Sequence, residues 1–134
     1  MDAADAGRLS RMLVVFLETG TAPEGLFHPD VFLDLTMPTW RVQARGAADL
    51  VQVRKEGHPG PGTVARWRAD PLPAGLVFEF EERWRHQGQD WYAREMMRLD
   101  VVDGAVARLT VYCTGDWDEA RQREHARSVT LIEP

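Results

Sequence analysis

The stretch from Ala74 to Trp117 constrains the fold most, because its pattern predicts two long β-hairpins in succession. We expect a two-residue turn at Gly88-Gln89, where glycine supplies a positive φ, and a second turn at Asp103-Gly104. The strands are AGLVFEFEERWRHQ, QDWYAREMMRLDVV and AVARLTVYCTG. They exceed the ~5–6 residues usual for a strand, which favours a curved sheet with bulges.

The first turn fixes which side chains share a face of this hairpin. With a turn at Gly88-Gln89, Glu82 lies opposite Glu95 on a face that is otherwise apolar except for His86. Opposed carboxylates on an apolar face break the pattern, and such breaks tend to mark functional sites. Apolar candidates for a ligand-binding wall, which would suit a flat hydrophobic molecule, are Trp40, Phe78, Phe80, Trp84, Trp91 and Met97.

The two carboxylates suggest acid/base chemistry. Two carboxyl groups within ~5 Å in an apolar pocket cannot comfortably both ionise, so one should hold its proton near neutral pH. The pair Glu82 and Glu95 would then supply an acid and a base for enolisation, dehydration or cyclisation. The alternative is structural: a bulge turns one glutamate outward, or an arginine pairs with it as a buried link.

The second turn decides whether Tyr112 joins this site. A two-residue Asp103-Gly104 turn places Tyr112 opposite Glu95, and we favour this arrangement slightly. A three-residue loop would instead point Val111 and Cys113 inward.

The sequence also predicts where three further polar residues lie. Alternation along VFLDLTMP leaves Asp34 either on an exposed face, which we favour, or in the pocket as a hydrogen-bond partner. His86 ends its strand, and a partly exposed place near a rim is favoured over a catalytic role. His58 lies within the turn-forming run GHPGPG, so we expect it in a solvated loop.

The rest of the chain completes an α+β domain spanning residues 1–134. Apolar spacing predicts an amphipathic helix over 3–19 that ends at Gly20. The remaining expected segments are a strand ending near Pro38, an irregular link over 37–45, a helix over 46–56, a strand over 63–70, a polar surface helix capped by Asp116, and a possible last strand over 128–134.

Composition and motifs limit the function classes. The net charge of −5, with basic residues interleaved among acids, argues against nucleic acid as the main partner. The single cysteine excludes an internal disulfide. Without a signal-like leader or an apolar run of ~20 residues, we expect a cytoplasmic protein with no membrane association. No metal-ligand spacing and no phosphate-binding loop is present, so we expect no metal and no cofactor.

The order of elements resembles the NTF2-like superfamily and, within it, the SnoaL-like group. The resemblance rests on LFHPDVFLDLTMP at the first strand, Arg45-Gly46-Ala47-Ala48 at a helix start, and DGAVARL followed by Val111-Tyr112. It implies helices packed on a strongly curved mixed or antiparallel sheet, which encloses an apolar pocket, and commonly a homodimer through the sheet.

The resemblance also implies a function. It points to a hydrophobic small molecule, polycyclic or terpenoid-like, and to a cofactor-independent isomerase, cyclase or dehydratase. The alternative is a non-catalytic ligand-binding or dimerisation module with the same fold. Known patterns of the superfamily carry over only in part. Ketosteroid isomerases use a tyrosine on the first helix, where Phe16 is the only aromatic residue here, and Glu82-Arg83-Trp84-Arg85 lacks the aspartate of limonene-epoxide-hydrolase-like members.

Overall fold

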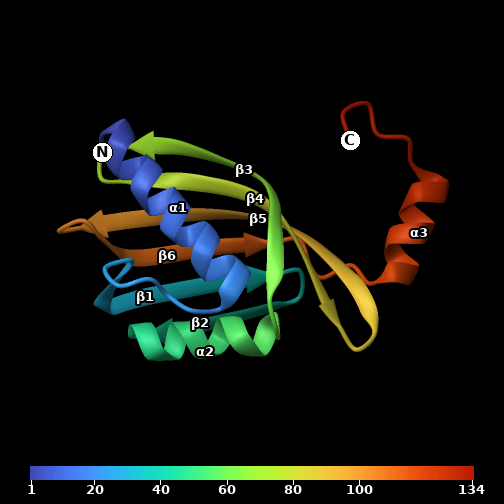
Figure 1. The fold of residues 1–134 in the computed structure, drawn as a ribbon, viewed down its shortest axis with the longest axis horizontal. Coiled ribbons are helices and arrows are strands. Elements are labelled where there is room, and N and C mark those ends of the chain that lie inside the picture. Colours follow the sequence, from blue (N-terminus) through green and yellow to red (C-terminus); the bar gives the residue numbers. More distant parts are fainter.

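A computed structural model describes residues 1–134, which form three helices and one sheet of six strands. In Figure 1 the C-terminal helix stands to one side of the sheet. In chain order the elements are α1 (Ala3–Thr19), β1 (Phe27–Met37), β2 (Trp40–Arg45), α2 (Ala47–Gly57), β3 (Gly62–Leu72), β4 (Gly75–His86), β5 (Gln89–Val102), β6 (Ala105–Cys113) and α3 (Glu119–Ser128).

The sheet is mixed and has the strand order β2-β1-β6-β5-β4-β3. Only β1 and β6 are parallel; the other neighbours are antiparallel. Helix α1 packs against β3 and β4, and α2 packs against β1 and β2, so both helices cover the same concave side (Figure 1). The expected α+β class and the mixed, curved sheet are confirmed.

The buried face of helix α1 packs into the hydrophobic core. Asp2 caps its start by accepting a 2.8 Å hydrogen bond from the Asp5 amide, and Gly20 ends it at φ 73°. Leu9, Leu13 and Phe16 form its buried stripe. These residues and the fully buried sheet residues Leu76, Phe78 and Leu99 belong to one hydrophobic cluster, as the apolar spacing of both segments predicts.

The turn between β4 and β5 corrects the predicted register. Gln87 and Gly88, at φ 52° and 74°, form the two-residue turn in place of Gly88-Gln89. The pairing moves by two residues, so Glu82 lies opposite Ala93, and Glu95 lies opposite Phe80. Because side chains alternate with a period of two, both glutamates stay on the predicted face.

The turn between β5 and β6 forms at Asp103-Gly104, as expected, and Val102 pairs with Ala105. An irregularity at Asp100 and Val101 then shifts the pairing by one residue. Cys113 consequently lies opposite Glu95, and the preferred position of Tyr112 is wrong. Tyr112 points to the convex face of the sheet and is 61% exposed.

Three expectations outside the hairpins are also wrong. Residues 40–45 form strand β2, which pairs with β1, where an irregular link was expected. The N-cap of α3 is Asp118 rather than Asp116, which leaves the Asp116 carboxylate free for another contact. The last residues, 129–134, form no strand.

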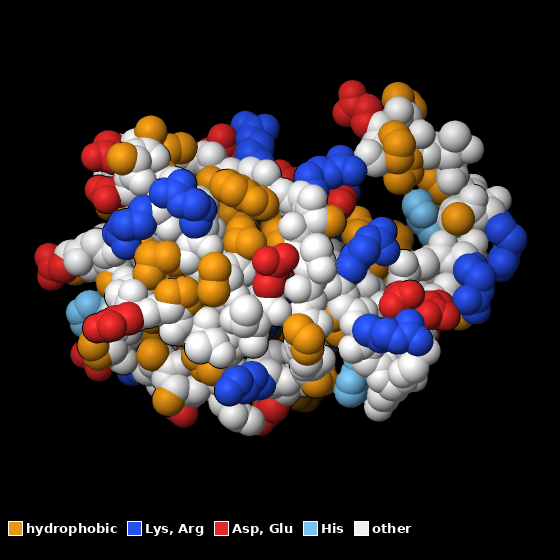
Figure 2. Space-filling model, viewed as in Figure 1, with side chains coloured by type: hydrophobic (Ala, Val, Ile, Leu, Met, Phe, Trp, Pro, Cys, Tyr) orange, Lys and Arg blue, Asp and Glu red, His pale blue; other side chains and the backbone are white.

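Helix α3 is as polar as the sequence predicts. None of its residues is buried, and Figure 2 shows charged side chains on it and a hollow between the C-terminal arm and the body. It docks on the β4–β5 hairpin through Trp117, whose backbone pairs with that of Tyr92. None of the three helices combines the length and apolar character needed to cross a bilayer.

Candidate functional site

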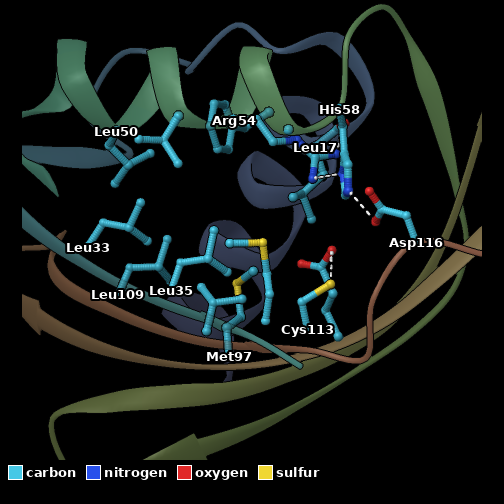
Figure 3. A pocket seen from close by; sticks show the side chains of 16 residues that line it. Leu17, Leu33, Leu35, Leu50, Arg54, His58, Met97, Leu109, Cys113 and Asp116 are labelled. Carbon is cyan, nitrogen blue, oxygen red and sulfur yellow. Dashed lines mark hydrogen bonds and ion pairs between the residues drawn. The ribbon is translucent and has the colours of Figure 1, made fainter. Parts of the chain in front are cut away.

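A cavity of about 100 Å³ lies between the sheet and the two helices on its concave side. Figure 3 shows leucine side chains converging on it, whereas the polar side chains gather at one end. Its apolar wall includes Leu33, Leu35, Leu50, Met97, Leu109 and Val111, and its polar lining is Arg54, His58, Glu95, Cys113 and Asp116. The cavity is therefore an apolar pocket with one polar end.

An ion-pair network around Glu82 forms the back of the polar end. Arg54, near the end of α2, donates to both carboxylate oxygens of Glu82 at 2.8 and 3.1 Å. It also donates to the Leu17 carbonyl at 2.8 Å, which ties α2 to the end of α1. The Glu82 side chain is only 3% exposed, so Arg54 supplies the charge that its burial requires.

His58 connects this network to Asp116, in the segment that follows β6. Its Nδ1 lies 2.7 Å from Glu82 Oε1, and its Nε2 lies 3.1 Å from Asp116 Oδ1. The imidazole ring stacks on Trp84 at a centroid distance of 4.1 Å. Only 10% of the His58 side chain is exposed, so the expected solvated loop position is wrong.

The hydrogen bonds set the charges of this network. Burial disfavours the imidazolium of His58, but its hydrogen bonds to Asp116 and Glu82 outweigh burial and raise its pKa to about 9. Burial also opposes ionisation of Glu82, yet the hydrogen bond from His58 and the charge of Arg54 lower its pKa to about 2. At neutral pH both groups are therefore charged, and the Nδ1–H of His58 bonds to Glu82 rather than to the Arg54 guanidinium 2.6 Å away, whose positive charge opposes the imidazolium.

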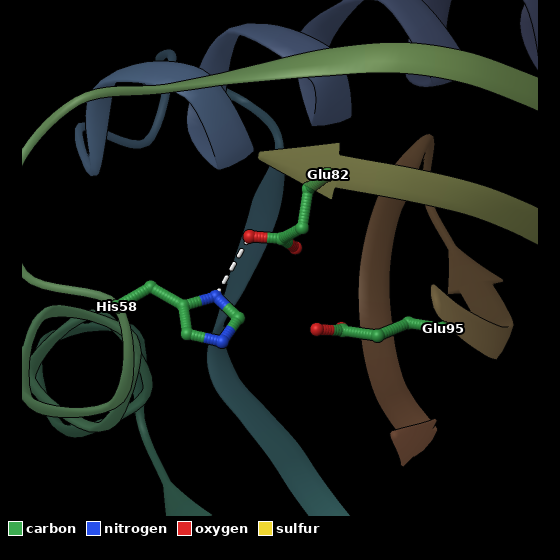
Figure 4. A group of neighbouring side chains, drawn as sticks. All are labelled: His58, Glu82 and Glu95. Carbon is green, nitrogen blue, oxygen red and sulfur yellow. Dashed lines mark ion pairs between the residues drawn. The ribbon is translucent and has the colours of Figure 1, made fainter. Parts of the chain in front are cut away.

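Glu95 has a different environment on the neighbouring strand. It is 7% exposed, has no ion pair, and accepts only from the Cys113 thiol, with 3.7 Å between Sγ and Oε1. Figure 4 shows its carboxyl pointing from β5 toward the ring of His58. Burial and the negative charge of Glu82 together raise the pKa of Glu95 to about 8. Glu95 is thus mainly a neutral acid at pH 7.

Cys113 borders Glu95 because of the irregularity between β5 and β6. Its Sγ accepts a hydrogen bond from the Gly115 amide at 3.4 Å. Burial and the charge of Glu95 raise the pKa of the Cys113 thiol to about 12. A thiol with this pKa is protonated at neutral pH, so Cys113 is a poor nucleophile and acts as part of the wall.

His58, Glu82 and Glu95 also have a spacing that could hold a metal ion. One potential ligand atom from each lies within 4.8 Å of the other two, a cluster that the sequence did not predict. The chemistry of these donors is unfavourable for a cation. Arg54 already binds both oxygens of Glu82, and its guanidinium lies 2.6 Å from His58 Nδ1.

The predicted ligand-binding residues divide into three groups. Met97 lines the pocket, as predicted. Trp84 and Trp91 lie behind the wall, where Trp84 supports His58 and stacks on Trp91 at 6.3 Å. Phe78 and Phe80 are fully buried in the core, and Trp40 is 69% exposed at the start of β2, so these three do not form the pocket wall.

Three predicted catalytic residues lie away from the pocket. Asp34 is on the convex face and forms an ion pair with Arg41, at 2.6 and 2.8 Å; the hydrogen bond from Arg41 lowers the pKa of Asp34. His86 ends β4 opposite Gln89 and does not line the cavity, while Tyr112 is exposed on the convex face. Glu82 and Glu95 are the two predicted residues that the structure brings together.

Three residues of the site escaped the sequence analysis: Arg54, His58 and Asp116. A signal for two of them exists, because Arg54 and His58 continue the spacing of Ala47 and Leu50 along one face of α2. When the buried face of a helix carries polar side chains at its C-terminal end, this pattern indicates that those side chains meet in one site. Asp116 carried no such signal, since its role depends on Asp118 being the helix cap.

Comparison with solved structures identifies the fold. An NTF2-like protein from Anabaena variabilis superposes with a TM-score of 0.69 at 15% identity, covering 87% of this chain and 94% of that one. A candidate ketosteroid isomerase from Kribbella flavida gives 0.61 at 24% identity (97% and 93% covered). A candidate polyketide cyclase from Xanthomonas campestris gives 0.61 at 16% identity (81% and 90% covered).

The class is therefore that of proteins with the NTF2-like fold, as the order of elements predicts. No protein-family model and no curated protein sequence matches the chain. Identities below 25% show a common fold, and the activity has to be argued from the pocket itself.

Proposed function

We propose that this protein is a cofactor-independent acid/base enzyme that acts on a hydrophobic small molecule, with Glu95 as its proton carrier. The observation that carries the proposal is the Glu95 carboxyl, which is buried at the polar end of an apolar pocket and has no ion-pair partner. A pKa of about 8 keeps both protonation states accessible near neutral pH, which favours general acid/base catalysis.

Glu95 can carry out both proton transfers of a dehydration or an isomerisation. In a dehydration, the neutral carboxyl donates its proton to a leaving hydroxyl, which departs as water. The resulting carboxylate then takes a proton from the adjacent carbon, and the electron pair of that C–H bond becomes the new double bond. Glu95 ends protonated again, so the cycle balances without a redox partner.

The other charged groups have supporting roles in this proposal. Glu82 is held ionised by Arg54 and His58, and its negative charge keeps Glu95 protonated at neutral pH. Glu82 is therefore a positioning residue rather than the second member of a catalytic pair. SnoaL-like resemblance implies a polycyclic or terpenoid-like substrate, and such a molecule would leave most of its rings outside a cavity of about 100 Å³.

A non-catalytic binding module is the second candidate. The observation that favours it is the complete pairing of Arg54, His58 and Glu82 with one another, which is also what a purely structural buried link would show. The two functions place different demands on Glu95. A binding protein requires only the pocket, whereas an enzyme also requires the carboxyl proton of Glu95.

Glu95→Gln separates these candidates. We expect this variant to lose at least about 10²-fold in turnover, since general acid/base groups contribute roughly that much, while it still binds ligand. NMR would follow loss of water or a double-bond shift in hydrophobic hydroxyketones and unsaturated ketones of one to four rings.

Glu79→Gln is the matched control, because Glu79 lies on the convex face of β4 with a 47% exposed side chain. Turnover should be unchanged in this variant. Equal turnover in wild type and Glu95→Gln would remove Glu95 from the mechanism, and a wild-type protein that binds these ketones without converting them would favour the binding module.

A further inference from the structure

The polar end of the pocket is balanced in charge. Arg54 and His58 contribute two positive charges, and Glu82 and Asp116 contribute two negative charges, each within hydrogen-bonding distance of a partner. Glu95 adds no charge while it is protonated. A charged ligand would therefore leave its solvation shell without gaining an unpaired counter-charge, so the pocket favours an uncharged ligand.

The Glu95 carboxyl determines which kind of polar atom a matching ligand carries. A neutral carboxyl has one O–H donor. Its polar neighbours are the weakly donating Cys113 thiol, with 3.7 Å between Sγ and Oε1, and the Glu82 carboxylate, whose oxygens Arg54 and His58 already hold. The remaining capacity of Glu95 is for a ligand oxygen that accepts a hydrogen bond. A carbonyl oxygen meets this need, and the leucine-lined interior accommodates the apolar part of the same molecule.

The volume limits the size of that apolar part. A dry cavity of ~150 Å³ lined by similar side chains holds one benzene molecule. At about 100 Å³ this cavity takes a ring of that order only if one edge of the ring faces the opening. At the polar end, His58 and Asp116 join the α2–β3 loop to the segment after β6 at 3.1 Å (Figure 3).

We infer that the pocket binds an uncharged, single-ring carbonyl compound, with its oxygen on Glu95 and its ring against the apolar wall that includes Met97. This inference deepens the proposed function by naming its substrate class, and it rests on that function for the chemistry but not for the binding. A fused polycyclic molecule exceeds a cavity of about 100 Å³, and at the polar end it would also have to displace the contact between His58 and Asp116.

Two adjacent methionines provide the measurement. Met97 lines the pocket, whereas Met96 lies on the convex face of the same strand and is 47% exposed. With ¹³C-labelled methionine methyl groups, cyclohexanone should shift the Met97 signal and leave the Met96 signal in place. A four-ring steroid ketone should shift neither signal, and benzoate and cyclohexylammonium at pH 6.5 should bind at least about tenfold more weakly than cyclohexanone.

A wall variant tests whether volume is the limit. Leu35→Ala removes side-chain volume at a half-buried wall position, so a two-ring decalone should shift Met97 in this variant and not in wild type. A four-ring ketone that shifts Met97 in wild type as strongly as cyclohexanone would overturn the inference, and so would equal binding of the charged compounds.

The outcomes separate this inference from the proposed function. Size selection is read from Met97 in both wild type and Glu95→Gln, so it does not require turnover. Selection for one ring without any turnover would support the ligand class and remove the enzyme. Turnover of a four-ring ketone that depends on Glu95 would support the enzyme and overturn the ligand class.

Discussion

The Glu82 carboxylate has a structural role, because it balances the charges of a buried network. It is the common partner of Arg54 and His58, and the Glu82 side chain is 3% exposed. Removing a single member of a buried charge network leaves the remaining charges without compensation. The residue should therefore matter more for stability than for any proton transfer.

Glu82→Ala is expected to lower the free energy of unfolding by about 3–5 kcal/mol, because Arg54 and His58 would keep their charges without the buried carboxylate that both contact. Urea unfolding at pH 6.5 measures this change. Glu79→Ala, which removes an exposed partner of Arg94 at 3.6 Å, should cost under about 1 kcal/mol. Similar losses in the two variants would show that the Glu82 network contributes nothing beyond a surface pair.

At the residue scale, the sequence predicted the two glutamates but not what surrounds them. Glu82 and Glu95 stood out because a carboxylate is unexpected on an apolar strand face. The division of labour between them could not be predicted. It depends on Arg54 and His58, which come from α2 and its following loop. Their spacing marks the polar end of the α2 stripe, but not which glutamate they contact.

Strand register explains which errors mattered at the scale of elements. The turn at Gln87-Gly88 moved the β4–β5 pairing by two residues, and every side chain kept its face. The irregularity at Asp100 and Val101 moved the β5–β6 pairing by one residue and exchanged Tyr112 for Cys113. Turn residues indicate where a hairpin reverses, whereas a bulge depends on the curvature of the whole sheet.

Thiol labelling tests this register directly. Cys113 is the only cysteine, and its burial and high pKa predict slow reaction with iodoacetamide at pH 7.5 in the folded protein. In a Tyr112→Cys, Cys113→Ser variant the thiol should lie on the convex face and react much faster. Mass spectrometry measures both rates. Faster labelling of the wild-type protein would place residue 113 outside and residue 112 inside the pocket.

The pH dependence of stability belongs to the whole molecule. The pKa of His58 rises from 6.5 to about 9 on folding, so its stabilisation is complete below pH 6.5 and is lost as the pH rises toward 9. The pKa of Glu95 rises from 4.5 to about 8, so keeping it buried costs progressively more between these values. Both groups therefore weaken the fold as the pH rises from 6.5 to 8.

Urea unfolding between pH 5.5 and 8.5 measures this effect. The free energy of unfolding should fall with rising pH, by up to about 1.4 kcal/mol per pH unit for each group. Glu95→Gln should make the fall shallower, because its side chain does not titrate. At the acid end the sign reverses: Glu82, with its pKa near 2, loses its stabilisation as the pH drops below 4.5. Stability that increased from pH 6.5 to 8 would contradict these assignments.

At the scale of the whole molecule, the sequence predicted the architecture well. The apolar stripe of α1 and the two long hairpins are strong periodic signals, and their order led to the NTF2-like fold. The size of the cavity could not be predicted in this way. It is set by how closely α2 approaches β1 and β2, which depends on packing among many side chains rather than on any pattern along the chain.

Because Trp84 stacks on His58, the fluorescence of Trp84 depends on the charge of the imidazole. A protonated imidazole in contact with an indole quenches its fluorescence by accepting an electron from the excited state, whereas a neutral imidazole does so less. With ring centroids 4.1 Å apart, Trp84 emission reports the charge of His58 without any attached dye. A molecule that displaced Asp116 from the ring would lower the pKa of His58, so the pH at which Trp84 emission changes would report events at the polar end of the pocket.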